Sequence, residues 1–197
     1  MKTNDITSGH CTLLAWALGA AFAVAAPLAN AALVTNGDFE TGDLSGWTQT
    51  GSTDSFGVDS FAAQSGAFGA FFGPEQPGTL SQSIATTAGQ TYKVDYWLEL
   101  DDSAQPNSFS WSWGGVTQTP NLINAAGFEY REFSATVTAT GTSASLAFTF
   151  DNPQSFWLLD NVSVTAVAAV PEPGTYALMS AGLLVLAAVT RKKKRGA

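Results

Sequence analysis

The sequence contains very few of the residues that enzymes most often use for catalysis. Its one cysteine, Cys11, and its one histidine, His10, both lie close to the N-terminus. The rest of the chain therefore has no disulfide, thiol nucleophile, histidine base or usual zinc site. Two carboxylates are enough for a glycosidase, but the close acidic pairs, Asp101–Asp102 and Glu129–Glu132, lie at loop or strand edges, where solvated acids are the rule. The sequence predicts a protein that is not an enzyme.

Basic residues are scarce in the middle of the chain. Of eight lysines and arginines, only Lys93 and Arg131 lie within residues 32–167, against fourteen acidic residues, so this part carries a net charge near −12. Nucleic-acid binding depends on neutralising phosphates, which excludes a nucleic-acid partner. An acidic surface rich in serine and threonine suits solubility outside the cell, and carboxylates suit divalent cations.

Long apolar runs are absent except near the two ends of the chain. Near the N-terminus, Lys2 precedes an apolar run, Leu13–Ala26, and Ala29–Ala31 has the small-x-small pattern of a cleavage site. This order predicts a signal peptide at residues 1–31, cleaved after Ala31 or one residue later, although Asp5 is unusual before such a run. The alternative is an uncleaved N-terminal membrane helix.

Residues 168–197 combine three segments with different physical properties. Prolines fix an extended backbone in the first segment, the uncharged segment at about 174–190 predicts a membrane helix, and a basic segment stops membrane transfer. The uncharged run is slightly shorter than the ~20 residues that span a bilayer, which suits a temporary anchor. The first segment is Val170, Pro171, Glu172 and Pro173, and the basic one is Arg191, Lys192, Lys193, Lys194 and Arg195.

This order closely resembles the PEP-CTERM sorting tail of Gram-negative bacteria that make exopolysaccharide. The resemblance implies that an exosortase recognises the Pro-Glu-Pro segment and removes the helix. The protein is then expected to cross the inner membrane, to be anchored there briefly, and to reach the cell surface or the medium. The alternative is an ordinary tail anchor with an accidental Pro-Glu-Pro.

Residues 32–167 contain about nine or ten short alternating segments and no helical period. In Thr91–Leu100, apolar and polar residues alternate as they do in a half-buried strand. Phe109 to Trp113 alternates with serines, and Leu33–Thr35 is expected to open the domain as a strand. Near the end, Phe156, Leu158, Val162 and Val164 are expected to share one face. The pattern predicts one all-β domain, an antiparallel sandwich.

A second resemblance covers this domain. Asn36–Glu40 followed by Gly46 and Trp47, Ala88–Val94, and Leu159–Val164 look like the galactose-binding-like jelly-roll sandwich, and in particular its carbohydrate-binding modules. The family implies a structural calcium ion that ties the first strand to the last, and Glu40 and Asp160 match its ligands. The alternative is that Asp160 accepts hydrogen bonds from the N-terminal turn without a metal.

A glycan site requires exposed aromatic rings beside polar groups. The best candidate is Trp97, on the polar face of its strand with Lys93 and Asp95, and Tyr130 and Trp157 are weaker candidates. For each aromatic residue the alternative is packing in the core. The main hypothesis is a glycan-binding protein of the exopolysaccharide or biofilm matrix. The alternatives are a structural or adhesive matrix protein without a sugar site and, third, an ice-binding-type surface protein.

Overall fold

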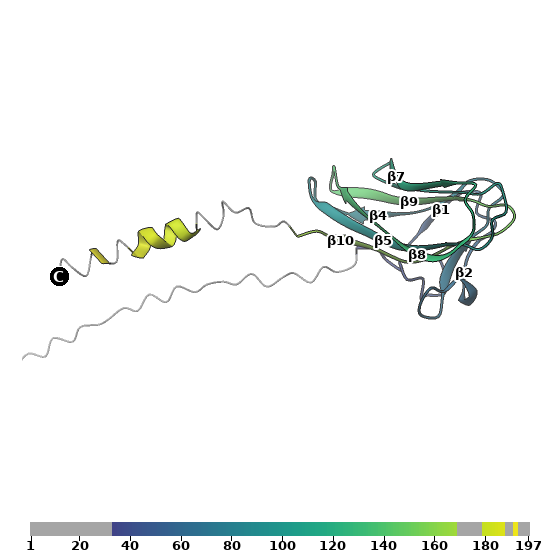
Figure 1. Cartoon of the computed structure of the whole chain (residues 1–197), viewed down its shortest axis with the longest axis horizontal. Helices are drawn as coiled ribbons and strands as arrows, with labels where there is room; N and C mark the ends of the chain where they lie inside the picture. Colours follow the sequence, from purple (N-terminus) through teal and green to yellow (C-terminus); the bar gives the residue numbers. More distant parts are fainter. Residues whose placement is uncertain (1–32, 169–178, 188–190, 193–197) are drawn as a thin grey trace, which may run out of the picture.

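The computed structural model describes residues 33–168, 179–187 and 191–192. Residues 33–168 form a sandwich of two stacked sheets (Figure 1). The expected signal peptide and the Val170–Pro173 motif lie outside the described residues. Residues 179–187 are helical and fall within the expected membrane segment. In the described ranges, no helix is both long and apolar enough to span a membrane.

Each sheet has five antiparallel strands. The first sheet has the order β1-β4-β9-β6-β7, with β1 (Thr48–Gly51), β4 (Gly78–Ala85), β9 (Ser143–Asp151), β6 (Ser108–Trp113) and β7 (Val116–Ile123). The second has the order β2-β3-β10-β5-β8, with β2 (Phe56–Asp59), β3 (Gly69–Phe72), β10 (Trp157–Ala166), β5 (Thr91–Leu100) and β8 (Phe128–Thr138). A short 3-10 helix, η1 (Ser60–Ala62), follows β2. The chain passes repeatedly between the sheets, so the predicted all-β jelly-roll sandwich is confirmed.

The core lies between the two sheets and is rich in aromatic side chains. On β5, alternate residues from Tyr92 to Leu100 are buried, while the residues between them lie on the outer face of the sheet. Phe72 and Phe150 stack across the core with ring centroids 4.0 Å apart. Alternation of side chains along each strand therefore produces one buried and one outer face per sheet.

Strand β10 contains a β-bulge that the sequence pattern did not reveal. Asp160 pairs with Trp97 and Ser163 pairs with Asp95, so β10 has one extra residue at this point. The extra residue reverses the alternation, and Asn161 adopts a positive φ of 52° there. The prediction that Phe156 and Leu158 share a face with Val162 and Val164 is therefore wrong, because the residues that enter the core before the bulge are Trp157 and Leu159.

The first expected strand also needs correction. Leu33–Thr35 is not a strand, although the Leu33 amide donates a hydrogen bond to the Val164 carbonyl. The first strand is instead β1, at the edge of the first sheet, whereas the last strand, β10, lies in the second sheet. The N-terminal segment nevertheless lies beside the last strand, as the galactose-binding-like resemblance implied.

Candidate functional site

The outer face of β5 brings together three of the predicted glycan-binding residues. Lys93, Asp95 and Trp97 alternate along one side of the strand, away from the core. In the sheet, Trp97 lies between Glu132 of β8 and Asp160 of β10. Its side chain is half-buried. Part of the indole is therefore available to a ligand, and its neighbours across the strands are carboxylates.

Lys93 is held in place by its neighbour on the strand. Its ammonium nitrogen lies 2.8 Å from the Asp95 carboxylate, and the lysine side chain is 49% exposed. The hydrogen bond and charge of Asp95, helped by the charge of Glu132, raise the pKa of Lys93. Lys93 therefore stays charged and supplies a fixed hydrogen-bond donor on an otherwise acidic face.

Tyr130 reaches the same face from β8, but its hydroxyl is already engaged. It donates a hydrogen bond to the Ala62 carbonyl of η1, and the ring is half-buried. Burial raises the pKa of Tyr130, and the nearby charges of Asp160 and Glu99 add to the effect. Tyr130 thus fastens η1 to the sheet, and its hydroxyl proton is not free to be donated to a ligand.

The position of Trp157 rules it out as a glycan-binding residue. Its side chain is fully buried, with its ring 5.6 Å from Phe109 and 6.1 Å from Phe128 between centroids. A ring in this position cannot stack on a sugar. The cause is the β10 bulge, which places Trp157 on the inner face of its sheet.

Glu40 and Asp160 hold the two ends of one loop. The Glu40 carboxylate accepts the amide N–H groups of Ala67 and Phe68 at 2.8 and 3.0 Å. The fully buried Asp160 carboxylate accepts those of Gln64 and Ser65 at 2.9 and 3.2 Å. Burial raises the pKa of Asp160, although these amides oppose the shift. The two carboxylates therefore clamp residues 64–68 onto β10.

Hydrogen bonds already occupy most of the carboxylate oxygens that the expected calcium ion would use. Calcium is held by six to eight oxygen ligands, whereas Glu40 Oε1 and both oxygens of Asp160 accept amide N–H groups here. The described part of the chain contains no group of three or more histidine, cysteine or acidic residues that could hold a metal ion. Calcium binding by Glu40 and Asp160 remains a prediction, and at Asp160 the ion would share or replace the amide hydrogen bonds.

Three of the acidic residues considered for catalysis, together with Glu99, line one cavity, whereas Glu132 does not. Glu99, Asp101, Asp102 and Glu129 line a cavity of about 340 Å³ at one end of β5 and β8. Burial, followed by the charges of Glu129 and Asp101, raises the pKa of Glu99. A carboxyl with a raised pKa is a feature of acid catalysts, but an acidic cluster alone assigns no reaction.

Sequence reasoning missed a hydroxyl-rich face on the opposite side of the molecule. Alternate residues of β4, β9 and β6 point outward from the first sheet, and most are serine or threonine. Thr79 and Thr149 share a hydrogen bond of 2.9 Å across two of these strands. The signal was present in the alternating serines of β6, but only the pairing of strands places them beside those of β9.

Comparison with known families assigns the C-terminal segment. Residues 169–193 match the model of the PEP-CTERM protein-sorting motif. The chain carries a PEP-CTERM sorting motif. The match covers Val170–Pro173 and Arg191–Lys193, as predicted from the sequence, and ends before Lys194. No curated protein matches the sequence.

Comparison with solved structures identifies the type of sandwich. TmCBM61, solved in complex with β-1,4-galactotriose, is 18% identical with a TM-score of 0.57, over 70% of this chain and 99% of that one. A family 16 carbohydrate-binding module is 17% identical with a TM-score of 0.52, over 68% and 99%. The CBM22-1 xylan-binding domain of Paenibacillus barcinonensis Xyn10C is 17% identical with a TM-score of 0.50, over 68% and 93%. At these identities the likeness shows the fold of carbohydrate-binding modules, without assigning a ligand.

Proposed function

We propose that this chain is an exported, non-enzymatic glycan-binding protein of the exopolysaccharide or biofilm matrix, processed at its tail by an exosortase-like enzyme. The observation that carries the proposal is the combination of two parts in one chain. Residues 169–193 match a protein-sorting motif, and residues 33–168 fold like carbohydrate-binding modules. The tail brings the protein into the membrane and releases it, and the sandwich supplies the binding surface.

The outer face of β5 is the proposed glycan surface. An indole presents a flat apolar ring to the C–H groups of a sugar. Lys93 and Asp95 lie beside Trp97, where they can form hydrogen bonds with the hydroxyl groups of that sugar. Solved relatives of the fold include a complex with β-1,4-galactotriose and a xylan-binding domain. These relatives favour a neutral β-linked polysaccharide as the partner.

The test is a binding experiment with the exported form of the protein and a Trp97→Ala variant. The probes are galactan, xylan and the host's own exopolysaccharide, each with calcium and with a chelator. Truncation of a central aromatic anchor costs about 2 kcal/mol, so we expect roughly thirtyfold weaker binding. Ile123→Ala is the matched control, because Ile123 is 71% exposed on the other sheet. If the unmodified protein binds none of these polysaccharides under either condition, the proposal is wrong.

One observation favours the alternative of a structural or adhesive matrix protein. Trp97 is only half-exposed, and its neighbours on β8 and β10 are the carboxylates of Glu132 and Asp160. Under this alternative the protein enters the matrix without recognising sugar. Retention of Trp97→Ala in the isolated matrix at the level of the unmodified protein would support it.

A further inference from the structure

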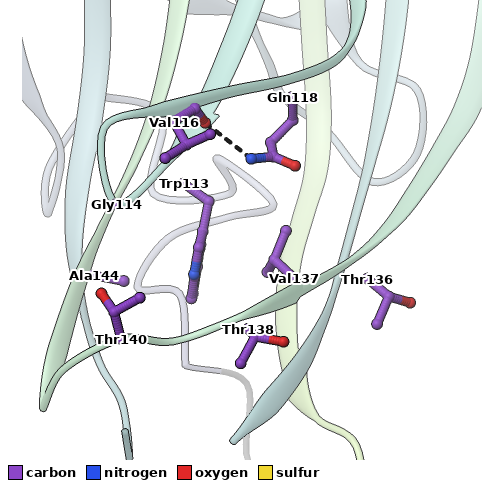
Figure 2. A pocket seen from close by; sticks show the side chains of 9 residues that line it. All are labelled: Trp113, Gly114, Val116, Gln118, Thr136, Val137, Thr138, Thr140 and Ala144. Carbon is purple, nitrogen blue, oxygen red and sulfur yellow. Dashed lines mark hydrogen bonds between the residues drawn. The ribbon is translucent and has the colours of Figure 1, made fainter. Parts of the chain in front are cut away.

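The open side of the sandwich contains a cavity that the proposed glycan surface does not include. It has a volume of about 350 Å³ and lies between β7 and β8, the edge strands of the two sheets. Edge strands present unpaired backbone groups. The lining residues are Trp113, Gly114, Val116, Gln118, Thr136, Val137, Thr138, Thr140 and Ala144 (Figure 2). The cavity is therefore bordered by hydrogen-bonding groups from both sheets.

The indole of Trp113 supplies an unused hydrogen-bond donor at this cavity. Trp113 is only 4% exposed and packs against Tyr92 with ring centroids 5.8 Å apart. Its Nε1 atom is buried and has no hydrogen-bond partner among the residues that the structure describes. Figure 2 shows the ring extending between Val137 on one side and Ala144 and Thr140 on the other. A buried N–H without an acceptor is unfavourable, so a ligand oxygen at this point would be stabilised.

The other lining groups define the chemistry of a ligand. None of the lining residues is charged, and an ionised ligand would lose its hydration without a compensating charge. The Gln118 amide donates to the Val116 carbonyl at 2.9 Å, which leaves its side-chain oxygen free to accept. The Thr140 hydroxyl can donate or accept. Val116, Val137 and Ala144 offer apolar surface to C–H groups, so a neutral molecule with both hydroxyl and C–H faces fits this lining.

We propose that this cavity binds a sugar unit or chain end of a neutral saccharide, and that a lining side chain shifts on binding so that a sugar oxygen accepts the buried Trp113 N–H. The inference rests on the proposed glycan-binding function and adds a second site to it. Ligand sites have volumes of about 300–1,000 Å³, and a cavity near the lower limit suits one or two sugar rings. The two sites are separate, because Trp97 lies on the outer face of the second sheet whereas Trp113 lies on the inner face of the first.

The test follows the indole N–H signals of the exported protein by NMR after tryptophan is labelled with ¹⁵N. Trp113→Phe and Trp97→Phe assign the two relevant signals. The probes are β-1,4-galactotriose and xylotriose, and trigalacturonic acid is the charged counterpart. We expect a neutral trisaccharide to shift the Trp113 signal saturably, while the charged one leaves it in place.

A threonine variant in the cavity wall and a control variant outside it measure the contribution of the wall to binding. Thr140→Val keeps the shape but removes a hydroxyl, and it is expected to weaken the Trp113-detected affinity by roughly three- to tenfold. Thr117→Val is the matched control, because Thr117 is an exposed neighbour of the lining residues that is not part of the lining. Both side chains are exposed, so neither variant should disturb folding. The comparison of their affinities therefore tests the cavity site even if Trp113→Phe fails to fold.

Each other outcome overturns the inference. A response from Trp97 alone would support glycan binding on the outer face of β5 and would show that the cavity is not a binding site. No response from either indole would contradict the cavity site, whereas the proposed function is decided separately by the polysaccharide-binding experiment. An equal response to trigalacturonic acid would exclude selection for a neutral sugar. A Trp113 shift that follows protein concentration without sugar would instead identify strand addition between two copies at β7 and β8.

Discussion

Asp160 is the buried carboxylate that holds the loop at 64–68. It is fully buried and accepts amide hydrogen bonds from Gln64, Ser65 and Asn161. Asp160→Ala leaves these three donors without a partner, and we expect the free energy of unfolding to fall by about 3 kcal/mol. Chemical denaturation measures the change. Asp54→Ala, at an exposed position, is the control, and an equal loss in both variants would contradict the clamp.

Asp151 gives a pH-dependent prediction at the same scale. Burial raises its pKa above the usual 3.8, so the folded state holds this proton more tightly than the unfolded chain does. Its contribution to stability is therefore greatest below pH 4 and is lost as the pH rises through the raised pKa. Asp151→Asn cannot ionise, so its stability relative to the unmodified protein should increase from pH 3 to pH 7.

The measurement for Asp151 is a set of denaturation curves across that pH range. We expect a gain of up to about 0.5 kcal/mol at neutral pH, the size usual for a partly exposed site. The exposed Asp54→Asn serves as a charge-matched control, because it removes the same charge without burial. A difference between Asp151→Asn and the unmodified protein that stays constant with pH would contradict the prediction.

At the scale of elements, η1 packs closely on β3 because Gly69 has no side chain. A Cβ atom at Gly69 would lie well inside contact distance of the Ala62 carbonyl oxygen. This oxygen also accepts the Tyr130 hydroxyl. Gly69→Ala should therefore destabilise the protein by about 1–3 kcal/mol, the cost of overpacking. At Gly141, a Cβ would lie 3.7 Å from the Ser143 carbonyl oxygen, so Gly141→Ala should melt close to the unmodified protein.

The strands show what the sequence could and could not predict. Strand β5 runs from Thr91 to Leu100 as predicted, because period-two alternation depends only on neighbouring residues. The β10 bulge depends instead on pairing with β5, and for this reason the inner position of Trp157 was missed. The resemblance brought Glu40 and Asp160 to one region, but it did not indicate that the amides of residues 64–68 would occupy both carboxylates.

The cavity beside Trp113 illustrates a further limit. Its lining comes from β6, β7, β8, β9 and the turns between them, and these segments meet only because β7 and β8 form the edges of the two sheets on the same side of the sandwich. The sequence marks Trp113 as one of three alternating aromatic residues, and nothing in that pattern distinguishes it from Trp111, whose indole N–H donates to the Thr119 carbonyl. Sites formed between edge strands require the topology, whereas the sorting motif is contiguous and can be recognised from the sequence alone.

At the scale of the whole molecule, the matched sorting motif predicts that the tail is removed in the native host. Intact mass spectrometry of each cell fraction measures this. We expect a chain that ends near Val170 in the medium or surface fraction. Glu172→Ala changes the Pro-Glu-Pro segment without altering the apolar run, so this variant should keep Arg191–Arg195 and remain in the inner membrane.

A matched control is available within the chain itself. Glu75 is exposed and follows the buried Pro74 in the loop before β4, so Glu75→Ala alters a second Pro-Glu pair without touching the tail. Normal processing of Glu75→Ala together with retention of Glu172→Ala would place recognition in the motif rather than in the sandwich. An unmodified protein found only in the inner membrane with its basic residues intact would mean an ordinary tail anchor. The proposal of a matrix protein would then lose the step that delivers it outside the cell.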